Sequence, residues 1–319
     1  MSLKSNRLNF LSDSSGVSVI FGAVLLLGIL MLFFSAYLIT AVPAQILSEE
    51  SANQESFHSD LLNLFEKMAN PAADFSSIGS KRGTRFFSAE HSAGFVDENG
   101  GRLLFEADIV LPPESAEFLK TKDTEGKEVK ISEKAEEEAE EKAFEIYTLG
   151  SGSIVFFNSY TQLSDRVYYF GPASLILSQK DGAVSVTPAA VRLSKNESGS
   201  ALISLSGRVF KSGGAPVFGN QTAVFFERLQ KAEGVGFATA LSVWYIPPPN
   251  DDFSFTSAEF AENRDECIRK MFYDLHRQIQ SEYPDLDSVY DSKNIRLQIH
   301  SEIPIEIYFC VEEFAVAFE

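Results

Sequence analysis

Basic side chains are scarce in this chain of 319 residues. The sequence has 27 lysines and arginines against 45 aspartates and glutamates, which gives a formal net charge of −18 at pH 7. Nucleic acids and anionic lipid headgroups bind to basic surfaces, because cations must neutralise their phosphates. The deficit therefore argues against nucleic acid as a partner and favours a soluble, self-repelling exterior.

Residues that carry metal, nucleophilic or phosphate chemistry are also few. The sequence lacks Gly-x-Ser-x-Gly, a phosphate-binding glycine loop and Cys-x-x-Cys. None of its histidines has the paired spacing that would place two zinc ligands on one helix face. They lie scattered along the chain as His58, His91, His276 and His300. We therefore predict no metal site, no cofactor and no enzyme activity, and keep a membrane-tethered hydrolase only as a third hypothesis.

Cysteine is nearly absent, with Cys267 and Cys310 alone. In an oxidising compartment the two are expected to pair and close a loop of about 43 residues, which would contribute a few kcal/mol to stability. Such a bridge would fasten the C-terminal helix to the last strands. Two buried free thiols are the alternative that the sequence leaves open.

The most prominent feature that the sequence does contain is an uncharged apolar run from Val17 to Val42. As a helix, with about 1.5 Å rise per residue, it would be roughly 39 Å long, which exceeds the roughly 30 Å hydrocarbon core of a bilayer. Lys4 and Arg7 precede the run. The first charges after it are the acidic Glu49 and Glu50. This asymmetry predicts a single-pass membrane protein with a cytoplasmic N-terminus and an extracellular C-terminal domain.

The run has two simpler interpretations. It is longer than the apolar region of about 7 to 15 residues in a cleavable secretory signal, but Val42-Pro43-Ala44 before Gln45 offers small residues for signal peptidase. An unprocessed anchor helix is the other interpretation.

Residues 13–22, which read DSSGVSVIFG, introduce the run. This segment resembles the start of archaeal pilin-like or archaellin-like proteins, in which a short polar leader precedes a Val/Ile-rich helix. The resemblance implies cleavage between Gly16 and Val17 by a membrane peptidase. It also implies packing of the helix in the bilayer, or in a filament core with copies of itself or other pilin-like subunits. The sequence departs from the family at Ser14 and Ser15, where a basic residue is usual.

A second segment, residues 166–179, reads RVYYFGPASLILSQ. It resembles the outer domains of an uncharacterised group of archaeal pilin-like membrane proteins, in which an aromatic strand leads through a small-residue turn into an apolar strand. The two resemblances together cover about half of the chain and imply no catalytic residues.

The sequence divides into four parts. We expect a cytoplasmic leader at 1–16, a transmembrane helix at 17–42, a stalk helix and linker at 43–82, and a β-rich extracellular domain at 83–319 with a charged helical insertion at 114–147. Pro43 should kink or end the first helix. An apolar stripe then predicts the stalk helix, with Phe57, Leu61, Leu64, Phe65 and Met68 on one face.

The domain reads as mainly β with α. Short apolar segments joined by turn signals predict strands at 84–88, 94–96, 102–111, 154–157, 166–170, 174–178, 184–187, 191–194, 201–209, 221–227, 236–246, 295–300 and 303–318. Residues 97–101 read as the turn of a hairpin. We expect an antiparallel sandwich, because parallel strands need helical crossovers that the pattern does not show. One helix, from about Thr256 to before Pro284, should pack on the sheet.

Two sequons for N-glycosylation, at Asn196 and Asn220, fall in the part that we predict to be outside. The sequence thus favours a membrane-anchored, pilin-like cell-surface protein, with a structural or adhesive role in the envelope or a filament and with the lipid bilayer as a partner. The alternative is a monomeric membrane-tethered binding module.

Overall fold

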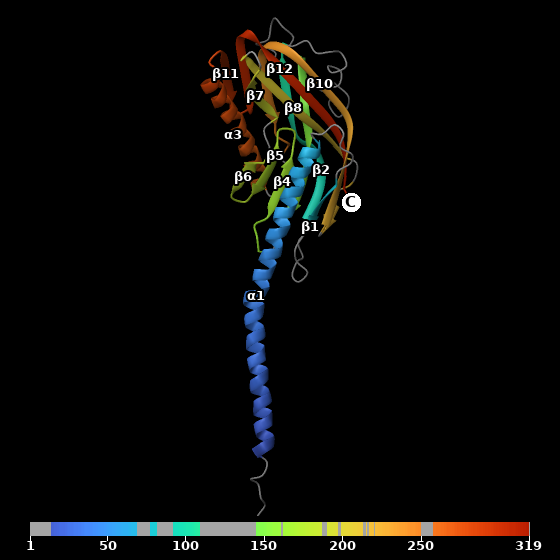
Figure 1. The fold of residues 1–319 in the computed structure, drawn as a ribbon, viewed down its shortest axis with the longest axis vertical. Coiled ribbons are helices and arrows are strands. Elements are labelled where there is room, and N and C mark those ends of the chain that lie inside the picture. The colour runs from blue at the N-terminus through green and yellow to red at the C-terminus, as the bar shows by residue number, and fades with distance from the viewer. Residues whose placement is uncertain are drawn as a thin grey trace, which may run out of the picture.

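A long helix and a β-rich head make up the molecule (Figure 1). The computed structural model describes residues 14–68, 77–81, 92–108, 145–160, 162–186, 190–196, 199–212, 215, 217–219, 221–249 and 258–318. We use "head" for the described residues from 77 to 318. Within the described residues the helices are α1 (Ser14–Met68) and α3 (Ala258–Glu282). The mainly β, α+β character predicted from the sequence is confirmed.

The strands follow one another along the chain with few interruptions. They are β1 (Ser77–Lys81), β2 (Ser92–Ala107), β3 (Glu145–Asn158), β4 (Arg166–Phe170), β5 (Leu175–Gln179), β6 (Gly182–Ser185), β7 (Val191–Lys195), β8 (Ala201–Ser212), β9 (Val217–Gly219), β10 (Gln221–Ile246), β11 (Leu286–Asp291) and β12 (Arg296–Phe318). The predicted strand at 166–170 coincides with β4, because a short run of aromatic and β-branched residues is bounded there by turn residues.

The strands form a single sheet that closes on itself, so the head is barrel-like and the predicted sandwich is wrong. Five strands complete the circuit in the order β2, β3, β8, β12 and β10, and the β3–β8 pairing between Ser151 and Val209 closes it. Two of these pairings are parallel, β8 with β12 and β3 with β8. The expectation of purely antiparallel strands failed because the crossover from β8 to β12 runs through β10, α3 and β11 rather than through one helix.

Closure brings β3 and β8 very close together, and glycines make this possible. A Cβ atom on Gly207 would overlap the carbonyl oxygen of Leu149, and one on Gly150 would lie 2.7 Å from the carbonyl oxygen of Arg208. Both are backbone atoms of the neighbouring strand, so no side chain can move aside. The two glycines are therefore required by the crossing.

The predicted hairpin at residues 97–101 is also wrong. The segment belongs to the continuous strand β2, and the pairing with β3 shifts register between Asp97 and Arg102. Gly101 has φ of +109°, a conformation that suits glycine. The turn-like residues therefore form an irregularity inside one strand rather than a reversal.

Two longer strands also join segments that the sequence analysis separated. β10 runs through residues 228–235, which include four charged or amide side chains and Gly234 and so do not read as a strand. β12 runs through residues 301–302, and the pairing of β10 with β12 shifts register between Ala238 and Ala240. The predicted helical insertion at 114–147 is wrong at its C-terminal end, because residues 145–147 lie in β3. Its residues 114–144 lie outside the described part of the chain. The predicted strand at 84–88 also lies outside it.

Each helix covers its own cluster of buried side chains. α3 packs on the sheet as predicted, with Phe260, Ile268, Phe272 and Ile279 buried against the larger cluster. α1 contributes Phe57 and Leu61 to the smaller, aromatic-rich cluster. α1 also continues through Pro43, so of the two predicted effects of this residue, a kink or an end of the helix, the end is not found. The segments predicted as a transmembrane helix and a separate stalk helix thus belong to one unbroken helix.

Candidate functional site

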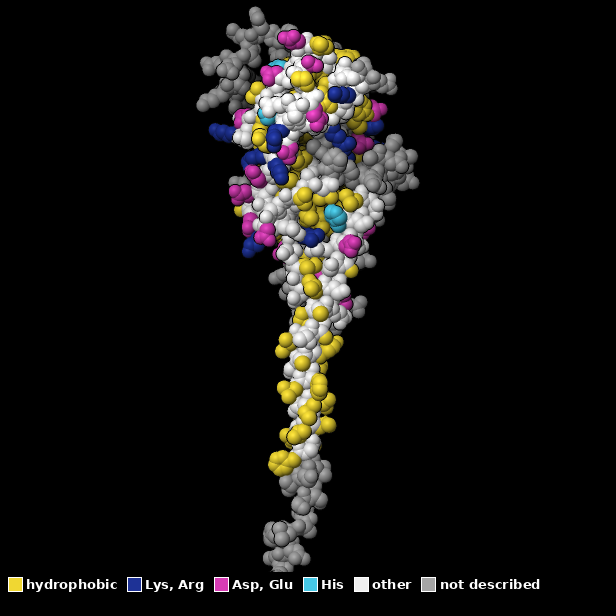
Figure 2. Space-filling view, turned by 60° about the vertical axis from the view of Figure 1, so that its left-hand side comes forward, with side chains coloured by type: hydrophobic (Ala, Val, Ile, Leu, Met, Phe, Trp, Pro, Cys, Tyr) yellow, Lys and Arg dark blue, Asp and Glu magenta, His cyan; other side chains and the backbone are white. Residues whose placement is uncertain are grey.

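The first half of α1 projects from the head (Figure 1), and apolar side chains lie exposed along the face of it that Figure 2 shows. From Phe21 to Ile39 the exposed fraction of its large apolar side chains lies between 43 and 74%. Among the described residues, α1 is the helix that is long and apolar enough to cross a membrane. We call residues 21–45 the bare segment. Water is a poor solvent for such a surface, so this segment needs an apolar environment.

The second half of α1 is anchored in the head by one face. The buried side chains recur every three or four residues, which places them on one side of the helix: Ile46, Glu50, Gln54, Phe57 and Leu61. The ring of Phe57 meets Phe156 and Tyr168 edge-on, with centroid distances of 5.3 and 5.2 Å. The docking therefore begins at Ile46, directly after the bare segment.

A buried carboxylate fixes the head to the helix at this boundary. Glu50 is 1% exposed, and its Oε2 accepts hydrogen bonds from the backbone N–H groups of Gln162 at 2.8 Å and Leu163 at 3.1 Å. The two donors belong to the loop between β3 and β4, in which the N–H of Tyr160 donates to Asp165 at 3.1 Å. Burial raises the pKa of Tyr160, so its hydroxyl stays neutral. We call this contact the Glu50 clamp.

The clamp was not predicted from the sequence. Glu50 counted there only as one of the first charges after the apolar run. Its position four residues after Ile46 and four before Gln54 is the signal that could have revealed it, because this spacing places a carboxylate on the buried face of a helix.

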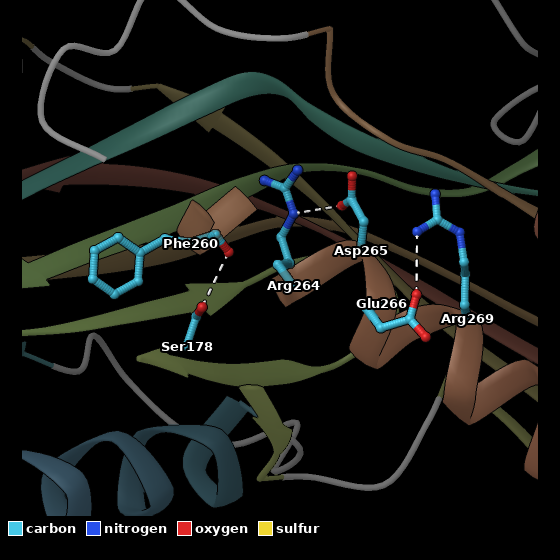
Figure 3. A network of polar contacts seen from close by, with 6 residues as sticks. All are labelled: Ser178, Phe260, Arg264, Asp265, Glu266 and Arg269. Atoms are coloured by element: carbon cyan, nitrogen blue, oxygen red, sulfur yellow. Dashed lines mark hydrogen bonds and ion pairs between the residues drawn. The ribbon is translucent and has the colours of Figure 1, made fainter. Parts of the chain in front are cut away.

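α3 carries a second buried charge, Arg264 (Figure 3). Arg264 is 7% exposed; its guanidinium lies 4.9 Å from the centroid of the Tyr169 ring, and its Nε donates to Asp265 at 2.8 Å. Burial alone would lower the pKa of Arg264, but Tyr245 and Asp265 outweigh it and raise the pKa. Nearby, the hydroxyl of Ser178 donates to the carbonyl of Phe260 at 3.0 Å.

The Arg264 cluster leaves almost no room for a ligand. Arg264, Tyr169, Tyr245 and Ser153 line a cavity of about 10 Å³, which is close to the lower limit for one water molecule. A second cavity of similar size is lined by apolar side chains, among them Phe272 and Leu275. In the part of the chain that the structure describes, no group of three His, Cys, Asp or Glu side chains could hold a metal ion. We assign the Arg264 cluster a structural role.

The residues of the predicted processing site lie near the start of α1. The helix begins at Ser14, so the bond between Gly16 and Val17 falls in its first turn. Cleavage there remains a prediction.

The predicted disulfide is not formed, because Cys267 and Cys310 are both free. Cys267 lies on α3 near the backbone of Ser185 in β6, whereas Cys310 lies opposite Glu233 in the β10–β12 pairing. Burial raises the pKa of both thiols. The apolar pattern of α3 correctly predicted which face packs on the sheet, but it did not specify which strands lie under each residue.

The two predicted glycosylation sites differ in what the structure shows. Asn196 is half-buried; its Nδ2 donates to Glu306 at 3.0 Å, and its Oδ1 accepts from the N–H of Ser200 at 2.9 Å. A glycan on Nδ2 would have to displace the contact with Glu306. Asn220 lies outside the described residues.

The head also has exposed apolar side chains where β10 and β12 pair. Their exposed fractions range from 36 to 71%, and the residues are Val235, Phe237, Ile303 and Tyr308. We call these four residues the distal patch. Val235 and Tyr308 are cross-strand partners, so the patch is continuous across the two strands. Figure 1 shows β10 and β12 crossing the end of the head that is farthest from the bare segment.

Comparisons of the chain with protein-family models, with curated proteins and with solved structures found no match.

Proposed function

We propose that this chain is a single-pass membrane protein of pilin-like organisation. The bare segment lies in the cell membrane, the N-terminal leader is cytoplasmic, and the head is displayed outside the cell as a structural or adhesive component of the envelope or of a filament. One observation carries the proposal: a single helix passes without interruption from a fully exposed apolar half to a half buried in the head.

The two halves of α1 need different surroundings. Burying a large apolar side chain is worth about 1.5 to 3 kcal/mol, so the many exposed side chains of the bare segment favour transfer to lipid strongly. The docked half is already buried by the head. Because the sequence places no charge between Asp13 and Glu49, the bare segment can enter the hydrocarbon core without burying a charged group.

Alkaline carbonate extraction of native membranes tests the anchor. We expect the full-length chain to stay in the membrane pellet, and protease added to intact cells without their surface layer to digest the head. Release of the chain by carbonate would refute the anchor, whereas a protected head would refute the orientation.

Mass spectrometry of the mature N-terminus tests the pilin-like processing. The proposal expects a mature chain that begins at Val17. A chain that begins at Gln45 would instead identify the apolar run as a secretory signal, and an intact N-terminus would identify an unprocessed anchor.

A monomeric tethered binding module is the second candidate, and the distal patch favours it. Exposed apolar groups on the paired strands β10 and β12 are well placed to contact a ligand or another envelope protein. Sedimentation of the chain, extracted in mild detergent, separates the candidates. Polymers that depend on the bare segment support the filament component, whereas monomers support the binding module.

A further inference from the structure

The boundary between the bare segment and the head contains no linker. Leu47 is still exposed, but Ile46 and Glu50 are already buried against the head. A rigid helix therefore sets the height of the head above whatever surrounds the bare segment. This inference rests on the proposed function, in which the bare segment lies in a bilayer.

The height follows from the length of the helix. The uncharged interval between Asp13 and Glu49 is centred on residue 31. A hydrocarbon core of about 30 Å extends about 10 residues to either side, so it ends near residue 41. The headgroup layer adds roughly 5 to 7 Å on each side, or about four residues. Ile46 and the start of the head thus lie at the outer limit of the headgroup layer.

One part of the head extends toward this layer. The loop between β3 and β4, with the described residues 159–160 and 162–165, is held against α1 by the Glu50 clamp. In Figure 1 it runs down beside α1, on the side of the bare segment. We call it the proximal loop. The clamp fixes its height because both of its hydrogen bonds are to backbone atoms.

The chemistry of the proximal loop suits the polar surface of a bilayer. Residues 159–164 carry no charge in a chain with a net charge of −18. The Glu50 carboxylate is covered by its two N–H donors, and Asp165 accepts a hydrogen bond within the loop. Gln162 and Ser164 are exposed and can hydrogen-bond to phosphate and ester oxygens, while Leu163 is half-buried.

We propose that the proximal loop lies in the headgroup layer of a zwitterionic phospholipid bilayer, so that the head rests on the membrane surface. The Glu50 clamp then positions this contact. The lipid contact is made by the loop itself, in addition to the anchor in the hydrocarbon core.

Fluorescence quenching in vesicles tests the contact. The single tryptophan is first replaced by Trp244→Phe, and one new tryptophan is placed at a time in the full chain: Gln162→Trp in the loop, Val289→Trp on β11 and Leu30→Trp in the bare segment. Val289 is the matched control, because it is exposed on a strand at the far end of the head. The vesicles are phosphatidylcholine with either a headgroup nitroxide or brominated acyl chains, present in both leaflets.

The proposal expects the headgroup nitroxide to quench the tryptophan at 162 more strongly than that at 289, and the brominated chains to quench the tryptophan at 30. Equal quenching at 162 and 289, with the tryptophan at 30 still quenched by bromine, would overturn the loop contact and leave the anchor intact. No quenching at 30 would overturn both. Ser164→Trp repeats the measurement on an exposed neighbour if Gln162→Trp does not fold.

Discussion

At the scale of single residues, Glu50 and Asp108 use their carboxylates in the same way. Each accepts backbone N–H groups from a segment more than a hundred residues away in the chain. A charged acceptor makes such hydrogen bonds stronger than neutral ones, and a donor left without it in the interior is costly. The position of the loop between β3 and β4 therefore depends on Glu50, and that of the middle of β10 depends on Asp108.

Replacing Glu50 tests the clamp. In Glu50→Ala the N–H groups of Gln162 and Leu163 lose their acceptor, and we expect the free energy of unfolding in detergent to fall by about 2 to 3 kcal/mol. Glu49→Ala is the control: its carboxylate is exposed and accepts from Gln45 one turn earlier, so its loss should cost no more than about 0.5 kcal/mol. Urea unfolding followed by circular dichroism gives both values. Equal losses in the two variants would contradict the clamp.

Asp108 predicts a specific dependence of stability on pH. Burial raises its pKa, but hydrogen bonds from the side chain and N–H of Thr239 and from the N–H of Ala240 outweigh burial and hold the pKa below its usual value. Its contribution to stability is therefore fully present above the unfolded pKa of about 3.9, and it is lost as the pH falls through the lower folded pKa.

The measurement compares unfolding free energies of the unmodified chain and Asp108→Asn between pH 2 and pH 7. We expect the variant to be less stable at pH 7 by about 1 to 2 kcal/mol, and this difference to shrink as the pH falls below about 3.9. Asp287→Asn, at an exposed position on β11, is the control. A difference that is constant over the whole range would contradict the assignment.

At the scale of elements, the docking of α1 depends on its aromatic contact with the head. Phe57→Ala removes a ring that packs against Phe156 and Tyr168 in the smaller cluster, and we expect a loss of about 3 to 5 kcal/mol in the free energy of unfolding. Leu47→Ala is the control: it removes an exposed side chain from the same helix, and the free energy of unfolding should change little. Limited proteolysis between α1 and the head should accelerate in the Phe57 variant alone.

The crossing of β3 and β8 gives a second prediction about elements. Gly207→Ala would place a Cβ atom on the backbone of Leu149, so we expect a loss of at least about 2 kcal/mol. Gly171→Ala is the control, since the nearest atom to its new Cβ would be 3.9 Å away. Thermal unfolding of both variants in the same detergent compares them. Equal stability would show that the two strands do not approach as closely as described.

The sequence predicted these elements unevenly, and for physical reasons. β4 was predictable because a short apolar, aromatic run is bounded by turn residues, and α3 because its apolar side chains recur at helical spacing. The continuity of β2, β10 and β12 was not, because polar and glycine-rich residues inside a strand look like turns when the partner strand is unknown. The parallel pairing of β8 with β12 depends on contacts between segments about a hundred residues apart, and no local pattern records it.

At the scale of the whole molecule, the bare segment and the head should be separable. A fragment of residues 43–319 retains the docked half of α1. It lacks Lys4, Arg7 and Asp13, so its formal net charge is −19 where that of the full sequence is −18. We expect this fragment to be a soluble monomer at neutral pH, since charge repulsion opposes association. Light scattering should rise as the pH approaches the isoelectric point, which is about 4.7 for the full chain.

A shorter fragment is the control for this prediction. Residues 62–319 lack Phe57 and Leu61, so the smaller cluster is exposed to water, and we expect this fragment to aggregate at neutral pH. Equal solubility of the two fragments would show that the docked half of α1 is dispensable for the head.

The place of β12 in the sheet has a consequence for biosynthesis. It follows every other described strand in the sequence, yet it lies between β8 and β10 and joins the two sides of the circuit. The circuit therefore cannot close until β12 has been synthesised, which happens after the apolar run at 17–42 has been made. Under the proposed membrane location, targeting would precede closure of the barrel, and the chain would cross the membrane before its fold is complete.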